Sequence, residues 1–173
     1  EFLAQLEANS FSELISRNTT LVSAPADVFD RPDIVSNLSA QKLPGEADCV
    51  LGTGHHSPEE VSLLVPAAQK AGITRILVTH PEWSVTFYSI EQQAHLARLG
   101  GVFFDRCFVS TTHRCGHVPF STIERAIAEI GVETTVLSTD LGQPDTPPPA
   151  EGFRMYAERL VGAGFNPDQV RLM

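Results

Sequence analysis

The stretch DCVLGTGHHSPEE, at residues 48–60, places a short apolar run directly before the start of a helix. The run up to Gly54 predicts a strand, because it is apolar, short and closed by glycine. Ser57 and Glu60 then have the spacing of a capping box, and a proline occupies the first helical position between them. This stretch therefore predicts one strand, one loop and one helix in succession.

The same pattern of apolar run, loop, amphipathic stretch and glycine occurs four times from residue 46 onward. The strand-like runs cover residues 48–54, 73–79, 102–109 and 132–139. The helices are expected to follow Ser57 and Ser89, to start at a cap formed by Ser121 and Glu124, and to cover about 151–161. Units of about 30 residues that alternate strand with helix indicate a parallel sheet with helices packed outside it. Such a sheet is either open and doubly wound or part of a barrel.

Two regions follow from this pattern. Residues 46–173 are expected to form four βα units, and residues 1–45 a helical or irregular segment with a possible short strand at Thr20–Ser23. Helices are also expected near residues 2–15 and 34–38. The total of four or five strands is about half of what an eight-stranded barrel of roughly 250 residues contains.

Composition narrows the classes of function. The chain has 173 residues, of which 42% are hydrophobic and 19% charged, an ordinary balance for a globular protein. Its net charge of −9 argues against nucleic-acid binding, which needs a basic surface. The sequence has neither an apolar run long enough to cross a membrane nor a signal-like segment, and its three cysteines are far apart. We therefore expect a cytoplasmic protein that acts on a small molecule or binds a protein partner.

Three of the apolar runs end in a residue that can bind a metal: His55, His80 and Asp140. Functional side chains of parallel α/β folds gather at the carboxyl ends of the strands, so these three are expected at one rim. Imidazole and carboxylate together suit a divalent ion, most often zinc, with manganese or iron as alternatives. Asp140 could bind the ion or accept a proton from a bound water. Each residue alone also fits a plain loop or turn position.

A second, weaker candidate is the H-x-C-x-H pattern formed by His113, Cys115 and His117. It could bind a metal, although a loop of this length often only covers a site. Trp83 is a candidate for lining a substrate pocket, with simple packing as an equal alternative. Cys107 lies inside an apolar run and is expected in the core.

Residues 50–55, 78–81 and 137–143 resemble the second half of amidohydrolase-superfamily proteins, a superfamily of metal-dependent hydrolases. They are most similar to a bacterial group of uncharacterised hydrolase-like members, and residues 53–60 are the most specific part. The resemblance covers about residues 45–173. It implies the C-terminal half of a TIM-like barrel.

The resemblance also implies roles for the strand-end residues. His55 and His80 would be metal ligands, and Asp140 would be both a ligand and the general base. The reaction would be hydrolysis of an amide, lactone or ester-like bond in a small organic molecule. We further expect substrate contacts from His56, Trp83 and Gln143.

Two departures from the superfamily open alternatives. The H-x-H motif of its first strand is absent, and no lysine or glutamate is an evident bridging ligand. The chain is therefore expected either to form a homo-oligomer or to pair with a chain that supplies the rest of the barrel. The rival function is a non-catalytic partner subunit that keeps the fold but holds no metal. A third interpretation, a monomeric flavodoxin-like domain, predicts phosphate at a helix N-terminus.

Overall fold

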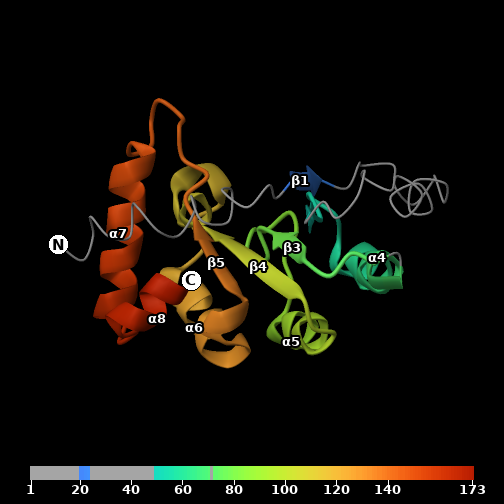
Figure 1. The fold of residues 1–173 in the computed structure, drawn as a ribbon. Coiled ribbons are helices and arrows are strands. Elements are labelled where there is room, and N and C mark those ends of the chain that lie inside the picture. Colours follow the sequence, from blue (N-terminus) through green and yellow to red (C-terminus); the bar gives the residue numbers. More distant parts are fainter. Residues whose placement is uncertain (1–19, 24–48, 71) are drawn as a thin grey trace.

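The fold is described from a computed structural model, which describes residues 20–23, 49–70 and 72–173. The helices expected near residues 2–15 and 34–38 lie outside this range. Within it, the short strand expected at Thr20–Ser23 is present as β1. The rest of the described chain contains the four βα units (Figure 1).

The strands form one parallel sheet whose spatial order, β1-β2-β3-β4-β5, follows the sequence. The remaining strands are β2 (Cys49–Gly52), β3 (Ile76–Thr79), β4 (Val102–Cys107) and β5 (Thr135–Ser138). The helices are α4 (Pro58–Lys70), α5 (Ile90–Arg98), α6 (Phe120–Ile130), α7 (Pro149–Gly162) and α8 (Pro167–Leu172). The expected parallel sheet of βα units is confirmed. No helix in the described residues is both long enough and apolar enough to cross a membrane.

Local sequence signals explain where most helices begin. Ser57 and Glu60 exchange the two hydrogen bonds of a capping box at the start of α4, and Ser89 does the same with Gln92 at α5. The cap expected at Ser121 is wrong, because α6 already begins at Phe120 and has no side-chain cap. Ser121 is instead the second residue of α6, and Glu124 lies beyond its first turn.

Two further boundaries differ from expectation. The run expected as a strand at 132–139 opens with a 3-10 turn, Val132–Thr134, and only then becomes β5. The short helix α8 was not expected from the sequence. It begins at an Asn166 cap followed by proline, and its N-terminal capping box joins Asn166 to Gln169.

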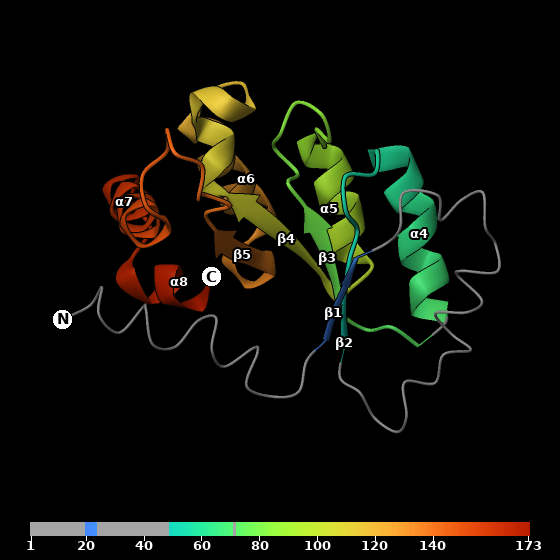
Figure 2. The same ribbon diagram turned by 90° about the horizontal axis from the view of Figure 1, so that it is seen from above.

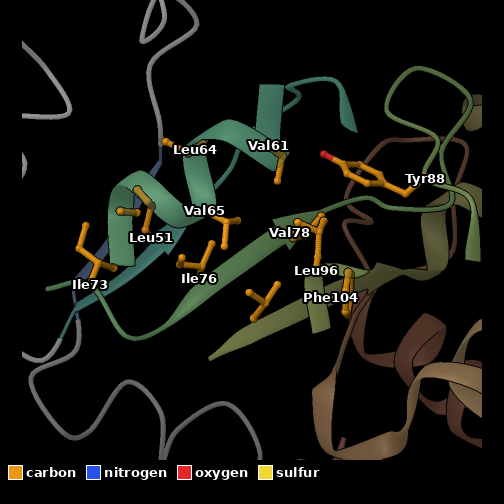
Figure 3. Close-up of a cluster of buried hydrophobic side chains, with 12 residues drawn as sticks. Leu51, Val61, Leu64, Val65, Ile73, Ile76, Val78, Tyr88, Leu96 and Phe104 are labelled. Atoms are coloured by element: carbon orange, nitrogen blue, oxygen red, sulfur yellow. The ribbon is translucent and has the colours of Figure 1, made fainter. Parts of the chain in front are cut away.

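Helices α4, α5 and α6 lie in a row along one face of the sheet (Figures 1 and 2). The strands alternate accordingly: in β3, Ile76 and Val78 are buried beneath the helices, whereas Leu77 and Thr79 are only half-buried. Figure 3 shows the resulting core cluster, whose buried members are Leu51, Val61, Leu64, Val65, Ala68, Ile73, Ile76, Val78, Tyr88, Leu96, Val102 and Phe104. Each large aliphatic member contributes roughly 1.5–3 kcal/mol by its burial.

The opposite face of the sheet is less covered. In β4, Phe103 and Asp105 alternate with the buried Val102, Phe104 and Arg106, and both are only half-buried. The same alternation continues in β5. Because neighbouring strands are in parallel register, these positions form one continuous surface across β3, β4 and β5. Polar groups on this surface lie toward the carboxyl ends of the strands.

The turn before β4 yields a stability prediction. Gly101 has φ +65°, and a Cβ there would lie 2.1 Å from the backbone oxygen of Thr74. Gly101→Ala is therefore expected to lower the free energy of unfolding by about 1–3 kcal/mol beyond the cost of the left-handed backbone. Gly100→Ala is the matched control, because its φ is +75° but no atom lies within 4 Å of its Cβ position. Equal urea midpoints for the two variants would contradict the clash.

Candidate metal centre

Three loops at the carboxyl edge of the sheet form one pocket. His55 follows β2, His80 follows β3 and Asp140 follows β5, so each strand delivers its residue to the same edge. The pocket has a volume of about 90 Å³. Its lining residues are His55, His80, Trp83, Val109, Ser110, Cys115 and Asp140.

The predicted ligands lie close together in this pocket. The rings of His55 and His80 stack with their centroids 5.2 Å apart, and His80 Nε2 lies 3.6 Å from Asp140 Oδ2. Trp83 stands edge-on to both imidazoles, at 5.3 Å from His55 and 5.8 Å from His80. The structure thus brings the three residues to one place, and their role as metal ligands stays a prediction.

The backbone at two of these positions is strained. Among the described non-glycine residues, positive φ occurs at His80 (50°), Asp140 (49°) and His117 (52°). Residues in this region persist only where their surroundings hold them, and they gather at functional sites. The Thr86 hydroxyl donates to the carbonyl oxygen of His80, and the Gln143 amide donates to that of Asp140 at 3.2 Å. Each loop therefore fixes the conformation of its own functional residue.

A second group of ligand atoms lies beside His80 on the less covered face of the sheet. Ligand atoms of His80, Asp105 and Cys107 all lie within 4.8 Å of one another. The Ser138 hydroxyl donates to Asp105 Oδ1 at 2.6 Å, and Cys107 Sγ lies 3.4 Å from Asp105 Oδ2. In the described part of the chain this is the one group of three or more histidine, cysteine and acidic residues with metal-binding spacing.

The surroundings favour the neutral forms of His80 and Cys107. Burial lowers the pKa of His80, although the carboxylates of Asp105 and Asp140 act in the opposite direction. A neutral imidazole keeps the lone pair that a metal needs. Burial also raises the pKa of the Cys107 thiol, and the neighbouring Asp105 carboxylate adds to this. Without a cation, Cys107 is therefore a protonated thiol.

The three expected substrate contacts are placed differently from one another. Trp83 lines the pocket as expected. His56 is buried, with its Nδ1 3.3 Å from Glu60 Oε2, and it is not among the pocket-lining residues. Gln143 does not line the pocket either, and its amide instead braces the Asp140 carbonyl. Of the three expected substrate contacts, only Trp83 therefore lines the pocket.

The H-x-C-x-H loop does not gather into a metal group within the described residues. His113 Nε2 and Arg114 Nε both bind the Asp145 carboxylate, at 2.8 and 2.6 Å, and the ring of His117 is 6.3 Å from that of His113. These bonds hold the pKa of Asp145 at about 2. Cys115 of the same loop lines the pocket. The loop thus covers the site and is tied to the β5–α7 loop by Asp145.

Sequence reasoning missed Asp105. The signal was present, because strict alternation in residues 102–107 puts Phe103, Asp105 and Cys107 on one face and the buried Phe104 on the other. The prediction that Cys107 is buried is confirmed at 2% exposure. Its neighbours are polar, however, so it is more than an apolar core residue.

A buried ion pair holds the loop that carries His80. Glu82, two residues after His80, pairs with the guanidinium of Arg106, which is fully buried on the helix side of β4. Arg106 also donates to Gln93 Oε1 at 3.0 Å and to Thr135 Oγ1 at 3.3 Å. The loop is therefore joined to β4, α5 and β5 by one polar network.

Comparison with known protein families matches part of the chain. A sequence model of the family described as "Family of unknown function (DUF6282)" matches residues 38–104, less than half of the chain. The matched stretch contains His55, His80 and Trp83 but ends before Asp105 and Asp140. No curated protein matches the chain.

Proposed function

We propose that this chain is a subunit of a metal-dependent hydrolase whose centre lies in the pocket at the carboxyl ends of β2, β3 and β5. The observation that carries the proposal is the 3.6 Å approach of His80 Nε2 to Asp140 Oδ2, with the His55 ring stacked beside His80. Imidazole and carboxylate groups from separate strands are common ligands of catalytic zinc. The resemblance of residues 45–173 to amidohydrolases supports the same reaction class.

The fold supports a TIM-like barrel of which this chain supplies about half. The described strands follow one another without the reversal of order that a doubly wound sheet requires. Helices α4, α5 and α6 cover one face, as helices do around a barrel, and the other face would form part of the interior. A second copy or another chain would complete the barrel.

The donor set fits zinc. His80 Nε2 lies 3.6 Å from Asp140 Oδ2, so a zinc bound to His80 by a bond of about 2.1 Å would stand beside the Asp140 carboxylate. When bound, the ion would polarise the substrate carbonyl and lower the pKa of a coordinated water toward ~7. The substrate class is a small amide, lactone or ester-like compound.

The side chains of the pocket would have separate roles in proton transfer, substrate contact and the exclusion of water. The Asp140 carboxylate is 55% exposed and lines the pocket, so Oδ2 can accept the proton of the attacking water and return it to the leaving group. The exposed His55 is placed to contact the substrate or the ion. Trp83 supplies an apolar wall that limits access of bulk water.

The metal content of the protein tests this proposal. Purified without chelator, the wild type is expected to hold near-stoichiometric zinc, and His80→Ala is expected to lose at least about tenfold in zinc affinity. His95→Ala is the matched control, because His95 is an exposed histidine of α5 that does not line the pocket. Elemental analysis of all three proteins gives the answer. Equal metal in wild type and His80→Ala, or none in the wild type, would contradict the proposal.

A non-catalytic subunit is the second candidate, and one observation favours it. The pocket volume of about 90 Å³ is well below the ~300–1,000 Å³ of most small-molecule sites. A half-barrel that only supports a catalytic chain would have such a pocket. Zinc binding without hydrolysis of esters, anilides and lactones, both alone and with any co-purifying chain, would favour this candidate.

A further inference from the structure

We infer that the ion is held beside this pocket by His80, Asp105 and Cys107, of which His80 also lines the pocket, which makes it a zinc site with a thiolate ligand. The inference rests on the proposed function, since it assumes that the pocket binds a metal. It assigns ligands from β4, a strand to which neither the sequence pattern nor the resemblance gave a role. It also leaves Asp140 available for proton transfer.

Strand register explains why these three donors meet. Thr79 pairs with Asp105 across β3 and β4, and His80 directly follows Thr79. Cys107 lies two residues beyond Asp105 and therefore on the same face of β4. Two donors thus come from β4 and the third from the residue that directly follows β3, and their ligand atoms lie within 4.8 Å of one another.

The negative charge of the Asp105 carboxylate favours a cation beside it. The Asp105 carboxylate is half-buried, and no lysine or arginine of the described residues forms an ion pair with it. Its close neighbours are the Ser138 hydroxyl, the Cys107 thiol and the His80 imidazole, and burial favours the neutral form of that imidazole. The less access a carboxylate has to water, the more it is stabilised by an opposite charge or a metal. A divalent ion would compensate Asp105 and a deprotonated Cys107 together.

The structural alternative is that Cys107 is only a small core residue. Against this, Cys107 Sγ contacts oxygen atoms: it lies 2.8 Å from Ser138 Oγ and 3.4 Å from Asp105 Oδ2. A packing cysteine would be surrounded by apolar groups. Mixed sulfur, nitrogen and oxygen donors favour zinc over magnesium or manganese, because thiolate is a soft ligand.

Cobalt substitution tests the inference by a readout other than activity. The full chain loaded with Co²⁺ is expected to show the near-ultraviolet charge-transfer band of a cobalt–thiolate bond. Cys107→Ser is expected to abolish this band, whereas Cys115→Ser, which changes the cysteine that lines the pocket, is expected to keep it. Loss of the band in Cys115→Ser, or its retention in Cys107→Ser, would overturn the assignment.

A measurement on the wild type tests the inference even if a variant fails to fold. X-ray absorption at the zinc edge is expected to show one sulfur at about 2.3 Å. Bound zinc without sulfur would overturn this inference and leave the proposed hydrolase centre standing. Failure of the wild type to bind either metal would overturn both. Asp105→Asn is expected to weaken zinc binding at least about tenfold, and full retention of affinity would remove Asp105 from the ligand set.

Discussion

Replacing Arg106 by methionine is expected to lower the free energy of unfolding by about 3–5 kcal/mol, because it leaves Glu82 buried without its cation. Arg106 is fully buried and Glu82 is 3% exposed, so water cannot take the place of the guanidinium. The loss is a large fraction of the stability of a typical domain, about 5–15 kcal/mol. Urea unfolding followed by circular dichroism measures it.

The pH dependence identifies the cause. Burial raises the pKa of Glu82 already in the wild type, and Arg106 is the largest influence that lowers it. In Arg106→Met the folded-state pKa of Glu82 is expected to rise further above its unfolded value. A group of this kind opposes folding as the pH rises through that range, so the deficit should be larger at pH 8 than near pH 4. A deficit that does not change with pH would point to lost packing instead.

Two variants serve as controls. The double variant Glu82→Leu and Arg106→Met removes both charges and is expected to recover most of the stability, since apolar replacement of a buried pair is often neutral. Arg125→Met changes an arginine that is 70% exposed and pairs with Glu129 of the same helix, and a shift within about 0.5 kcal/mol is expected. If the double variant is no more stable than Arg106→Met, the buried charge is not the cause.

The sequence was sufficient to predict the parallel sheet and the position of the pocket because both depend on local signals. Glycine after a strand, serine with glutamate at a helix start and a polar residue at a strand end each act within a few positions. The rule that strand ends share one edge then brings His55, His80 and Asp140 together without knowledge of any contact.

The missed features depend on contacts between distant residues. Arg106 and Glu82 are 24 positions apart in the sequence, and the residues around each do not indicate that the two form an ion pair. In the sequence Asp105 is an isolated acidic residue within a predicted strand. Only the register between β3 and β4 shows that it lies beside His80. The error at Ser121 has a different origin, because the same serine and glutamate spacing occurs here inside the helix and does not by itself fix a helix start.

Asp140→Asn is expected to lower kcat/KM by a factor of about 10²–10⁴ while the zinc content stays unchanged. An amide cannot accept the proton that Oδ2 takes from the attacking water, which accounts for a loss of this size. The backbone should not change, because asparagine tolerates the φ of 49° at this position as well as aspartate does. Hydrolysis of p-nitrophenyl esters, anilides and small lactones provides the assay, and elemental analysis gives the metal content.

The comparison with Asp105→Asn separates a proton acceptor from a ligand. Both variants replace a carboxylate near His80 by an amide, but Asp105 is one of the inferred ligands and Asp140 is not. Asp105→Asn should therefore lose metal and activity together, and activity should return in part at high zinc concentration. Asp140→Asn should keep its metal, and added zinc should not restore its rate. If Asp140→Asn instead loses zinc and is rescued by it, Asp140 is a ligand, and the exposed His55 of the same pocket becomes the next candidate for the proton acceptor.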